Sequence, residues 1–292
     1  MDLTGFVEEV DGDGPVTVVG GRTQWDVGGA VNASAREVRA PAGIVEFEPA
    51  EMTVRCGAGT PVAELDAAVG EHGQYVALAG ADGATVGGLL AVGRSGLRRL
   101  REGPMRDVLL EARYVSAEGR MIKAGGPTVK NVSGFDLCRV LVGSLGTLGF
   151  LGEVVVRCRP RPAVSRWFAG EADPFELIHR LHQPSSILWD GSTTWLLLEG
   201  HSADVEDQAR LAALFEVDGP PPLPTGGRRS VRPSALRTLS GTFVAEVGVG
   251  VVHTPEAAPA RVLDPEVAEL NLRVKQAFDP TGRLNPGRAA AA

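Results

Sequence analysis

The sequence predicts an α+β protein with two lobes, the first larger than the second. Short β-branched runs alternate with short helix patterns along 292 residues, a length that suits two domains. Glycine is unusually frequent, and its 38 residues gather in short loops between apolar runs. The run Arg159-Pro160-Arg161-Pro162 should break all regular structure. We therefore expect a first lobe over 1–162, a second over 163–275 and a C-terminal tail over 276–292.

Strands, helices and glycine loops follow one another in the first lobe. Thr60 suits the cap of a helix and Pro61 its first position, and Gly73 is a plausible end. Short helices are also expected over 85–91 and 135–142. The predicted strands cover 16–19, 44–48, 52–56, 108–116, 120–124 and 150–157.

The second lobe has a simpler order of elements. Its β-α-β-β-α order suggests an incomplete ferredoxin-like lobe. A last helix should present Val267, Leu270 and Val274 on one face. The predicted strands cover 164–168, 186–189, 194–199 and 243–253, and the predicted helices cover 174–182, 203–215 and 266–278.

Charge and composition exclude several classes of protein. The formal net charge is −7 and no basic stripe with interleaved aromatic residues is present, so nucleic acid is a poor partner. Arg98, Arg99 and Arg101 form a local basic cluster, which is either a solvated loop or a contact for an anionic partner or cofactor.

The sequence shows no targeting or membrane-spanning segment. Residues 1–9 are acidic and lack a signal-peptide core, and no run of about 18 apolar residues occurs. We expect a cytoplasmic protein without a transmembrane segment.

The three cysteines do not form a recognisable metal or disulfide pattern. Cys56, Cys138 and Cys158 are far apart, odd in number and without C-x-x-C spacing. All three lie in apolar stretches, so we interpret them as buried core thiols. No bound metal is predicted.

Three glycine loops, 20–24, 79–88 and 143–149, carry the chemical signal. Consecutive backbone N–H groups beside strands or helix starts form a cradle for an anion, and small hydroxyl residues accompany each loop. Three such loops in one lobe favour a nucleotide. The Rossmann pattern fails because no helix follows Gly20-Gly21 at once, and the Walker A pattern is absent. The cradle therefore belongs to another architecture.

Several motifs follow one another in a characteristic order. They are Thr85-Val86-Gly87-Gly88, the hairpin 108–124, Lys130-Asn131-Val132-Ser133-Gly134-Phe135-Asp136-Leu137, Gly143-Ser144-Leu145-Gly146-Thr147-Leu148-Gly149 and the ending 278–287. In this order they resemble the vanillyl-alcohol-oxidase (PCMH-type) superfamily of FAD-binding proteins. Within it, the sequence is most similar to the FAD-binding subunits of bacterial glycolate oxidase. The resemblance covers most of 10–162 and the last fifteen or so residues, and is weak over 163–265.

The resemblance implies a PCMH-type FAD-binding lobe of two subdomains, with the tail returning to it. Many relatives attach the flavin to a histidine of the first loop. Here no histidine lies between Met1 and Glu71, so non-covalent FAD is expected. The implied cofactor-binding residues are Gly20, Gly21, Arg22, Thr23, Gln24, Ala79, Gly80, Asp82, Gly83, Ala84, Thr85, Gly87, Gly88, Ala91, Gly93, Arg94, Leu145, Gly146, Thr147, Gly149, Phe150 and Asn285.

The implied activity is oxidation of a small 2-hydroxy acid, of the glycolate or D-lactate type, by hydride transfer to FAD. Catalytic residues are not assigned. His253, at the end of an apolar strand, is the one candidate base, and a core histidine is the alternative. His179 and His182, three residues apart, could share a helix face without a third ligand. The candidate cations for a substrate carboxylate are Arg94, Arg228, Arg229 and Arg237.

Three other functions stay open. The chain could be a non-catalytic FAD-carrying electron-relay subunit, working beside a second flavin subunit and an iron–sulfur subunit, which would allow a peripheral membrane location through the complex. It could also be a structural partner without flavin, although the intact glycine loops speak against this. Finally, the related reductase of cell-wall precursor synthesis shares the fold, but the motif 130–136 and the tail favour the glycolate-oxidase side.

Overall fold

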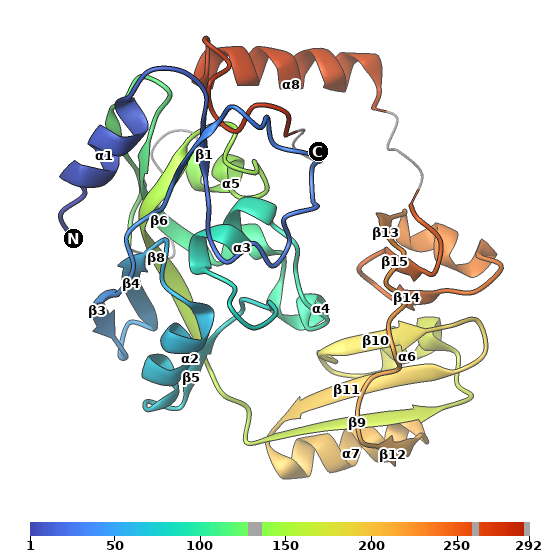
Figure 1. Ribbon diagram of the computed structural model, residues 1–292. Coiled ribbons are helices and arrows are strands. Elements are labelled where there is room, and N and C mark those ends of the chain that lie inside the picture. Colours follow the sequence, from blue (N-terminus) through green and yellow to red (C-terminus); the bar gives the residue numbers. More distant parts are fainter. Residues whose placement is uncertain (128–135, 259–262, 289–292) are drawn as a thin grey trace. The chain divides into compact units, whose positions relative to one another are not determined.

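The computed structural model describes residues 1–127, 136–258 and 263–288, and the chain divides into two compact units (Figure 1). Unit 1 comprises Met1–Gly96, Pro104–Arg161 and Leu263–Ala292, and unit 2 comprises Leu97–Gly103 and Pro162–Val262. The second unit thus ends earlier than the 275 expected from the sequence. Helix α8 (Pro265–Phe278) belongs to unit 1 because Val274 and Phe278 pack against the core of that unit.

A small layer begins unit 1. Helix α1 (Thr4–Asp11) precedes two parallel strands, β1 (Val16–Val18) and β2 (Arg36–Val38). Phe6 and Val10 of α1 are buried against a cluster that includes Phe150 and Leu284. The sequence analysis did not predict α1, because a short acidic segment with two buried residues depends on tertiary packing for its stability.

The main sheet of unit 1 is antiparallel and has the order β3-β4-β8-β6-β7, with β5 also paired to β8. Strand β8 extends to Pro160 because Gln74 and Tyr75 of β5 pair with Pro160 and Arg159. The prediction that regular structure breaks from Arg159 onward was therefore wrong. The strands are β3 (Ile44–Glu48), β4 (Thr53–Gly57), β5 (Gln74–Val76), β6 (Leu109–Val115), β7 (Met121–Gly125) and β8 (Phe150–Pro160).

Short helices pack against this sheet and bury the apolar residues Leu65, Leu90 and Leu141. Thr60 does not cap its helix: its Oγ1 donates to the Gly57 carbonyl at 2.7 Å, and Pro61 occupies the cap position. The helices are α2 (Val62–Gly70), α3 (Val86–Val92), the 3₁₀ turn η1 (Met105–Asp107) and α5 (Leu137–Leu141). Most of the motif 130–137 lies outside the described residues.

From Pro162 onward, unit 2 has strands and helices in β-α-β-β-α-β order, which is the order of a ferredoxin-like unit. Its antiparallel strands lie in the order β12-β9-β11-β10. The predicted helix 203–215 ends at Ala212, because Ala213 adopts a left-handed φ of 55° and Phe215 starts β12. The elements are β9 (Val164–Gly170), α6 (Pro174–Arg180), β10 (Ser186–Trp189), β11 (Thr194–Gly200), α7 (Ser202–Ala212) and β12 (Phe215–Val217).

Three further strands extend this sheet beyond β10, in the order β14-β15-β13. The single strand predicted over 243–253 is a hairpin of β14 (Val244–Glu246) and β15 (Val251–Thr254), because Gly248 and Gly250 turn the chain at φ 80° each. The remaining elements of unit 2 are β13 (Gly227–Ser230), the 3₁₀ segment η2 (Pro233–Thr238) and helix α4 (Arg99–Glu102), whose Leu100 packs on the core of the unit.

Candidate functional site

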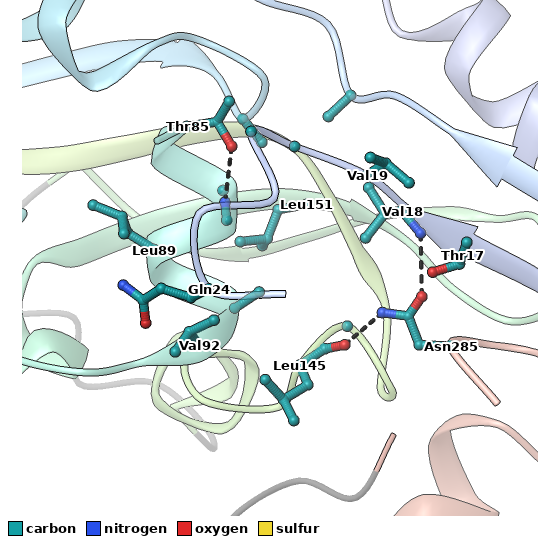
Figure 2. A pocket seen from close by; sticks show the side chains of 18 of the residues that line it. Thr17, Val18, Val19, Gln24, Thr85, Leu89, Val92, Leu145, Leu151 and Asn285 are labelled. Atoms are coloured by element: carbon teal, nitrogen blue, oxygen red, sulfur yellow. Dashed lines mark hydrogen bonds between the residues drawn. The ribbon is translucent and has the colours of Figure 1, made fainter. Parts of the chain in front are cut away.

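A cavity in unit 1 lies between two of the glycine loops and helix α3 (Figure 2). The space inside it, with the open solvent at its mouth included, is about 920 Å³. The walls come from the loop after β1, the start of α3, the loop before β8 and the C-terminal tail. Segments that are far apart in the sequence therefore meet at one cavity.

The first glycine loop needs its glycines because it touches other segments closely. A Cβ atom on Gly21 would lie 1.7 Å from the Gly83 carbonyl oxygen, and one on Gly20 would lie 2.3 Å from Thr85 Oγ1. Within the described parts of the chain, no backbone N–H of residues 20–24 donates to a protein acceptor. Free N–H groups on a cavity wall form a concavity that suits an anion.

Helix α3 begins beside this loop. Thr85 caps it, since Thr85 Oγ1 accepts a hydrogen bond from the Gly88 N–H at 3.3 Å. The Gly87 N–H donates to the Ala58 carbonyl at 2.7 Å, and a Cβ on Gly87 would lie 2.8 Å from the same oxygen. The start of α3 is thus held tightly against the segment that follows β4.

Asn285 connects the third glycine loop to strand β1 and the tail. Its Oδ1 accepts from the Val18 N–H at 3.1 Å, and its Nδ2 donates to the Leu145 carbonyl (Figure 2). Leu145 and Gly146 both have positive φ, 53° and 69°, and a Cβ on Gly146 would lie 2.6 Å from Asn285 Nδ2. Asn285 therefore fixes the loop that forms one wall of the cavity.

Two buried polar atoms of the lining suit a polar ligand. Thr17 Oγ1 and Gln24 Oε1 are buried at the cavity and have no hydrogen-bond partner in the described structure. Buried polar atoms are normally paired in proteins, so both indicate a missing partner. Leu89, Val92 and Leu151 supply an apolar wall (Figure 2). The lining thus combines anion-binding, polar and apolar surfaces, which matches the chemistry of FAD.

The structure brings many of the predicted site residues to this cavity and leaves others outside its lining. Ala79 and Asp82 lie in an exposed loop, Phe150 is buried in a core, and the hydroxyl of Thr147 donates to the Ser144 carbonyl at 2.7 Å. Those that line the cavity are Gly20, Gly21, Arg22, Thr23, Gln24, Thr85, Gly87, Gly88, Ala91, Leu145, Gly146, Gly149 and Asn285. Those outside the lining are Ala79, Gly80, Asp82, Gly83, Ala84, Gly93, Arg94, Thr147 and Phe150.

Sequence reasoning missed Trp25 and Arg288, which also line the cavity. The guanidinium carbons of Arg22 and Arg288 lie 5.0 Å and 4.6 Å from the centre of the Trp25 ring. Trp25 directly follows the first glycine loop, so its position in the sequence could have identified it as a cavity residue. Arg288 is about 260 residues away, and only the return of the tail places it there.

The cysteines are buried, as predicted, and lie outside the cavity lining. Burial raises the pKa of Cys56 and Cys158 to about 12 and that of Cys138 to about 11. These thiols stay protonated at neutral pH and are poor nucleophiles. The described lining contains no histidine.

His253 lies in the sheet of unit 2 and is 9% exposed. Its Nε2 lies 3.0 Å from Oε1 of Glu246, which is buried, and Arg228 Nη2 lies 4.0 Å from the same oxygen. Strand pairing sets this arrangement, because Arg228 and Val244 are both register partners of His253. The structure thus places the candidate base in a buried polar cluster within the sheet.

The other candidate residues do not form one group. Arg237 is ion-paired to Asp173 at 3.4 Å and stacks on Phe175 at 4.0 Å. Helix α6 ends at Arg180, so His179 and His182 do not share a helix face, and that prediction was wrong. Arg94 is exposed in unit 1, and Arg229 lies on β13 of unit 2. Among the described residues, no three His, Cys, Asp or Glu side chains are close enough to hold a metal.

The basic cluster of residues 98–101 has a structural role in unit 2. Arg98 donates to both carboxylate oxygens of Glu199, at 2.9 to 3.0 Å, and Arg101 donates to the Glu199 carbonyl. Burial alone would raise the pKa of Glu199, but hydrogen bonds from Arg98, Ser165 and Ser185 outweigh it and lower that pKa. The sequence left two interpretations open for Arg98, a solvated loop or a contact for an anionic partner or cofactor. Neither describes Arg98, because its partner is Glu199 of the same chain.

Comparison with known families gives the class of the protein. Residues 8–125 match the family described as FAD binding domain, and residues 234–289 match the FAD linked oxidases, C-terminal domain. The chain thus combines a PCMH-type FAD-binding domain with a segment that matches the C-terminal domain of FAD linked oxidases. The resemblance inferred from the motifs is thereby confirmed.

Particular relatives include the glycolate oxidase subunit GlcE of Escherichia coli (strain K12), which is 32% identical over 70% of this chain. D-lactate dehydrogenase of Archaeoglobus fulgidus is 40% identical over 50% of the chain, and glycolate oxidase subunit GlcD of Bacillus subtilis is 31% identical over 47%. The matched regions cover 61%, 34% and 31% of these three relatives, respectively.

Solved structures share the fold at low identity. An alkyldihydroxyacetonephosphate synthase superimposes with a TM-score of 0.64 at 14% identity, covering 93% of this chain and 71% of that one. The grass pollen allergen Phl p 4 superimposes with a TM-score of 0.55 at 13% identity, covering 72% and 47%. Within its described residues, the chain has no helix long and apolar enough to span a membrane.

Proposed function

We propose that this chain binds FAD non-covalently and acts as an FAD-dependent oxidoreductase, or as a subunit of one, that oxidises a small 2-hydroxy acid of the glycolate or D-lactate type. The cavity in unit 1 carries this proposal, because it combines unpaired loop N–H groups with unpaired buried polar atoms. The relatives named as glycolate oxidase subunits and a D-lactate dehydrogenase support the substrate class.

Each wall of the cavity would hold a different part of the cofactor. The N–H groups of residues 20–24 would bind the pyrophosphate, and Gln24 Oε1 and Thr17 Oγ1 would accept hydrogen bonds from hydroxyl groups. Thr85, Ala91 and Val92 would complete the site around the ribityl chain and flavin edge. Bound FAD supplies the hydride-accepting chemistry.

The side chains at the cavity support non-covalent binding. The described lining contains neither histidine nor cysteine, and the buried cysteines elsewhere in unit 1 have raised pKa values. Denaturing the yellow protein with acid or heat should therefore release all of its flavin colour into solution. Colour that stays with the denatured chain would refute non-covalent binding.

A second function is favoured by His253, namely an FAD-carrying electron-relay subunit without its own substrate site. His253 is already hydrogen-bonded to buried Glu246, so it is engaged inside the protein. The Escherichia coli relative is itself a subunit of glycolate oxidase. In this version, the chain would work beside a second flavin subunit and an iron–sulfur subunit in a peripheral complex.

One assay separates the two functions. The purified, FAD-loaded chain is mixed with glycolate or D-lactate and a dye acceptor, and dye reduction is followed. Turnover by the lone chain supports the oxidoreductase and excludes the relay version. Flavin that stays oxidised with both acids, while a chemical reductant bleaches it, supports the relay version. Co-purification from the native host would then identify the partner subunits.

A further inference from the structure

The C-terminal tail is built into unit 1 beside strand β1. The Val16 N–H donates to the Arg283 carbonyl at 2.9 Å, and the Asn285 N–H donates to the Val16 carbonyl at 2.8 Å. Lys275 Nζ and Asp279 Oδ2 are 2.6 Å apart and brace the start of the tail. These contacts carry the chain to Arg288 at the cavity wall.

Arg288 is held in a defined position there. Its Nη1 donates to the Val27 carbonyl, and its guanidinium carbon lies 4.6 Å from the centre of the Trp25 ring. Trp25 and Val27 follow the first glycine loop directly, so the loop and the tail contact each other through Arg288. An arginine that stacks on an aromatic ring keeps its remaining N–H donors available in a fixed plane.

The charge of Arg288 has no carboxylate partner at ion-pair distance among the described residues, whereas Arg22 on the same ring pairs with Glu37. Burial lowers the pKa of Arg288 and a more distant Asp26 opposes this, so the guanidinium stays charged but is partly desolvated. A partly desolvated cation without an anion is unfavourable. Arg288 lies on the cavity wall together with residues 20–24, whose N–H groups are unpaired. This position indicates that an anionic ligand pairs with the Arg288 guanidinium.

We propose that Arg288 is a cofactor-binding residue that pairs with the pyrophosphate of FAD, and that Trp25 holds its guanidinium in place. The tail then acts as a clasp, since the segment from Arg283 to Arg288 pairs with β1 and also delivers the cation. This inference rests on the proposed FAD binding. It adds the Arg288 cation to the backbone N–H groups of residues 20–24.

The test measures ligand binding to the flavin-free full-length chain by titration calorimetry, with FAD, ADP and adenosine as probes. Arg288→Gln should raise the dissociation constants of FAD and ADP roughly tenfold to a hundredfold, because a charge-assisted hydrogen bond is lost. Adenosine, which lacks phosphate, should bind as before. The dependence of FAD affinity on salt concentration should also weaken, and Arg288→Lys should recover part of the affinity.

Arg120→Gln is the matched control, because Arg120 also belongs to unit 1 but lies outside the cavity lining and has Glu118 as its partner. It should change the FAD dissociation constant less than threefold. Equal effects of the two variants, an unchanged FAD affinity in Arg288→Gln, or an equal loss of adenosine binding would each overturn the clasp. A wild-type chain that binds neither FAD nor ADP would instead overturn the proposed function.

Discussion

Asn285 shows how much of the site can depend on one side chain. It is 6% exposed and bonds to the backbone of both β1 and the loop before β8. Its own φ is 44°, a left-handed value that asparagine tolerates better than most residues. The resemblance implies that Asn285 binds FAD, and Asn285 lines the cavity while its amide also bonds to the protein. We propose that it positions the loop 145–149 as well.

Two substitutions of Asn285 separate the contribution of its amide hydrogen bonds from the cost of its positive φ. Asn285→Ala should lower the free energy of unfolding by roughly 3 kcal/mol, because two buried backbone groups lose their partners and alanine strains at positive φ. Asn285→Gly should lose roughly 1 kcal/mol less, since glycine adopts this φ freely. Urea unfolding of the flavin-free chain measures both values. Equal losses in the two variants would show that backbone strain plays no part.

Glu199 makes the stability of unit 2 depend on pH. Its pKa is lowered in the folded state, so its contribution is fully present above the ordinary value of 4.5 and is lost as the pH falls through the lowered value. Glu199→Gln should therefore reduce stability at neutral pH and flatten the acid decline below about pH 4.5. Denaturant unfolding at several pH values, followed by Trp167, Trp189 and Trp195, tests this. A variant as pH-sensitive as the wild type would refute the assignment.

At the scale of elements, the glycine loops were the most predictable feature. Loop positions could be read from the sequence because each loop follows a strand or precedes a helix pattern. Among the elements that were missed, α1, β2, β5, β12 and β13 are short and gain their stability from pairing or burial in the tertiary structure. The hairpin of β14 and β15 was read as one strand because Gly248 and Gly250 lie inside a continuous valine-rich run.

Substitution in the first glycine loop tests whether this loop requires its glycines. Gly21→Ala should destabilise the chain and weaken FAD binding at least tenfold, because the new Cβ meets the Gly83 carbonyl oxygen at 1.7 Å and the backbone must shift. Gly5→Ala is the control, since Gly5 lies in α1 with no atom within 4 Å of its added Cβ. That variant should gain up to about 1 kcal/mol of stability. FAD titration and thermal unfolding of both variants compare the two sites.

At the scale of the whole molecule, each unit has its own hydrophobic core. FAD should therefore stabilise unit 1 selectively. At a hundredfold excess over the dissociation constant, ligand binding adds about 2.7 kcal/mol, which should raise the melting temperature of unit 1 by roughly 5–10 °C. Trp25 lies in unit 1 and the three other tryptophans lie in unit 2. Variants that keep only Trp25, or only the other three, therefore report the unfolding of one unit by their fluorescence. Equal shifts in both sets would show that the units unfold as one.

The helix α8 shows where a sequence pattern and tertiary structure differ. Val267, Leu270 and Val274 were predicted to share one face, yet Val267 and Leu270 are 41% and 54% exposed and only Val274 packs on the core of unit 1. Periodicity identifies a helix and its apolar side, but it does not say how much of that side is covered. The second unit therefore ends at Val262 rather than at 275.

The sequence by itself determined the class of this protein. Glycine loops, their spacing and the closing motif depend on local backbone requirements, which are written in consecutive residues. The tertiary structure alone decided which residues meet at the cavity. Trp25 and Arg288, or Thr17 and Asn285, come together only because the tail pairs with β1, and such long-range pairing leaves no local signature in the sequence. The same holds for His253, whose partner Glu246 is set by strand register.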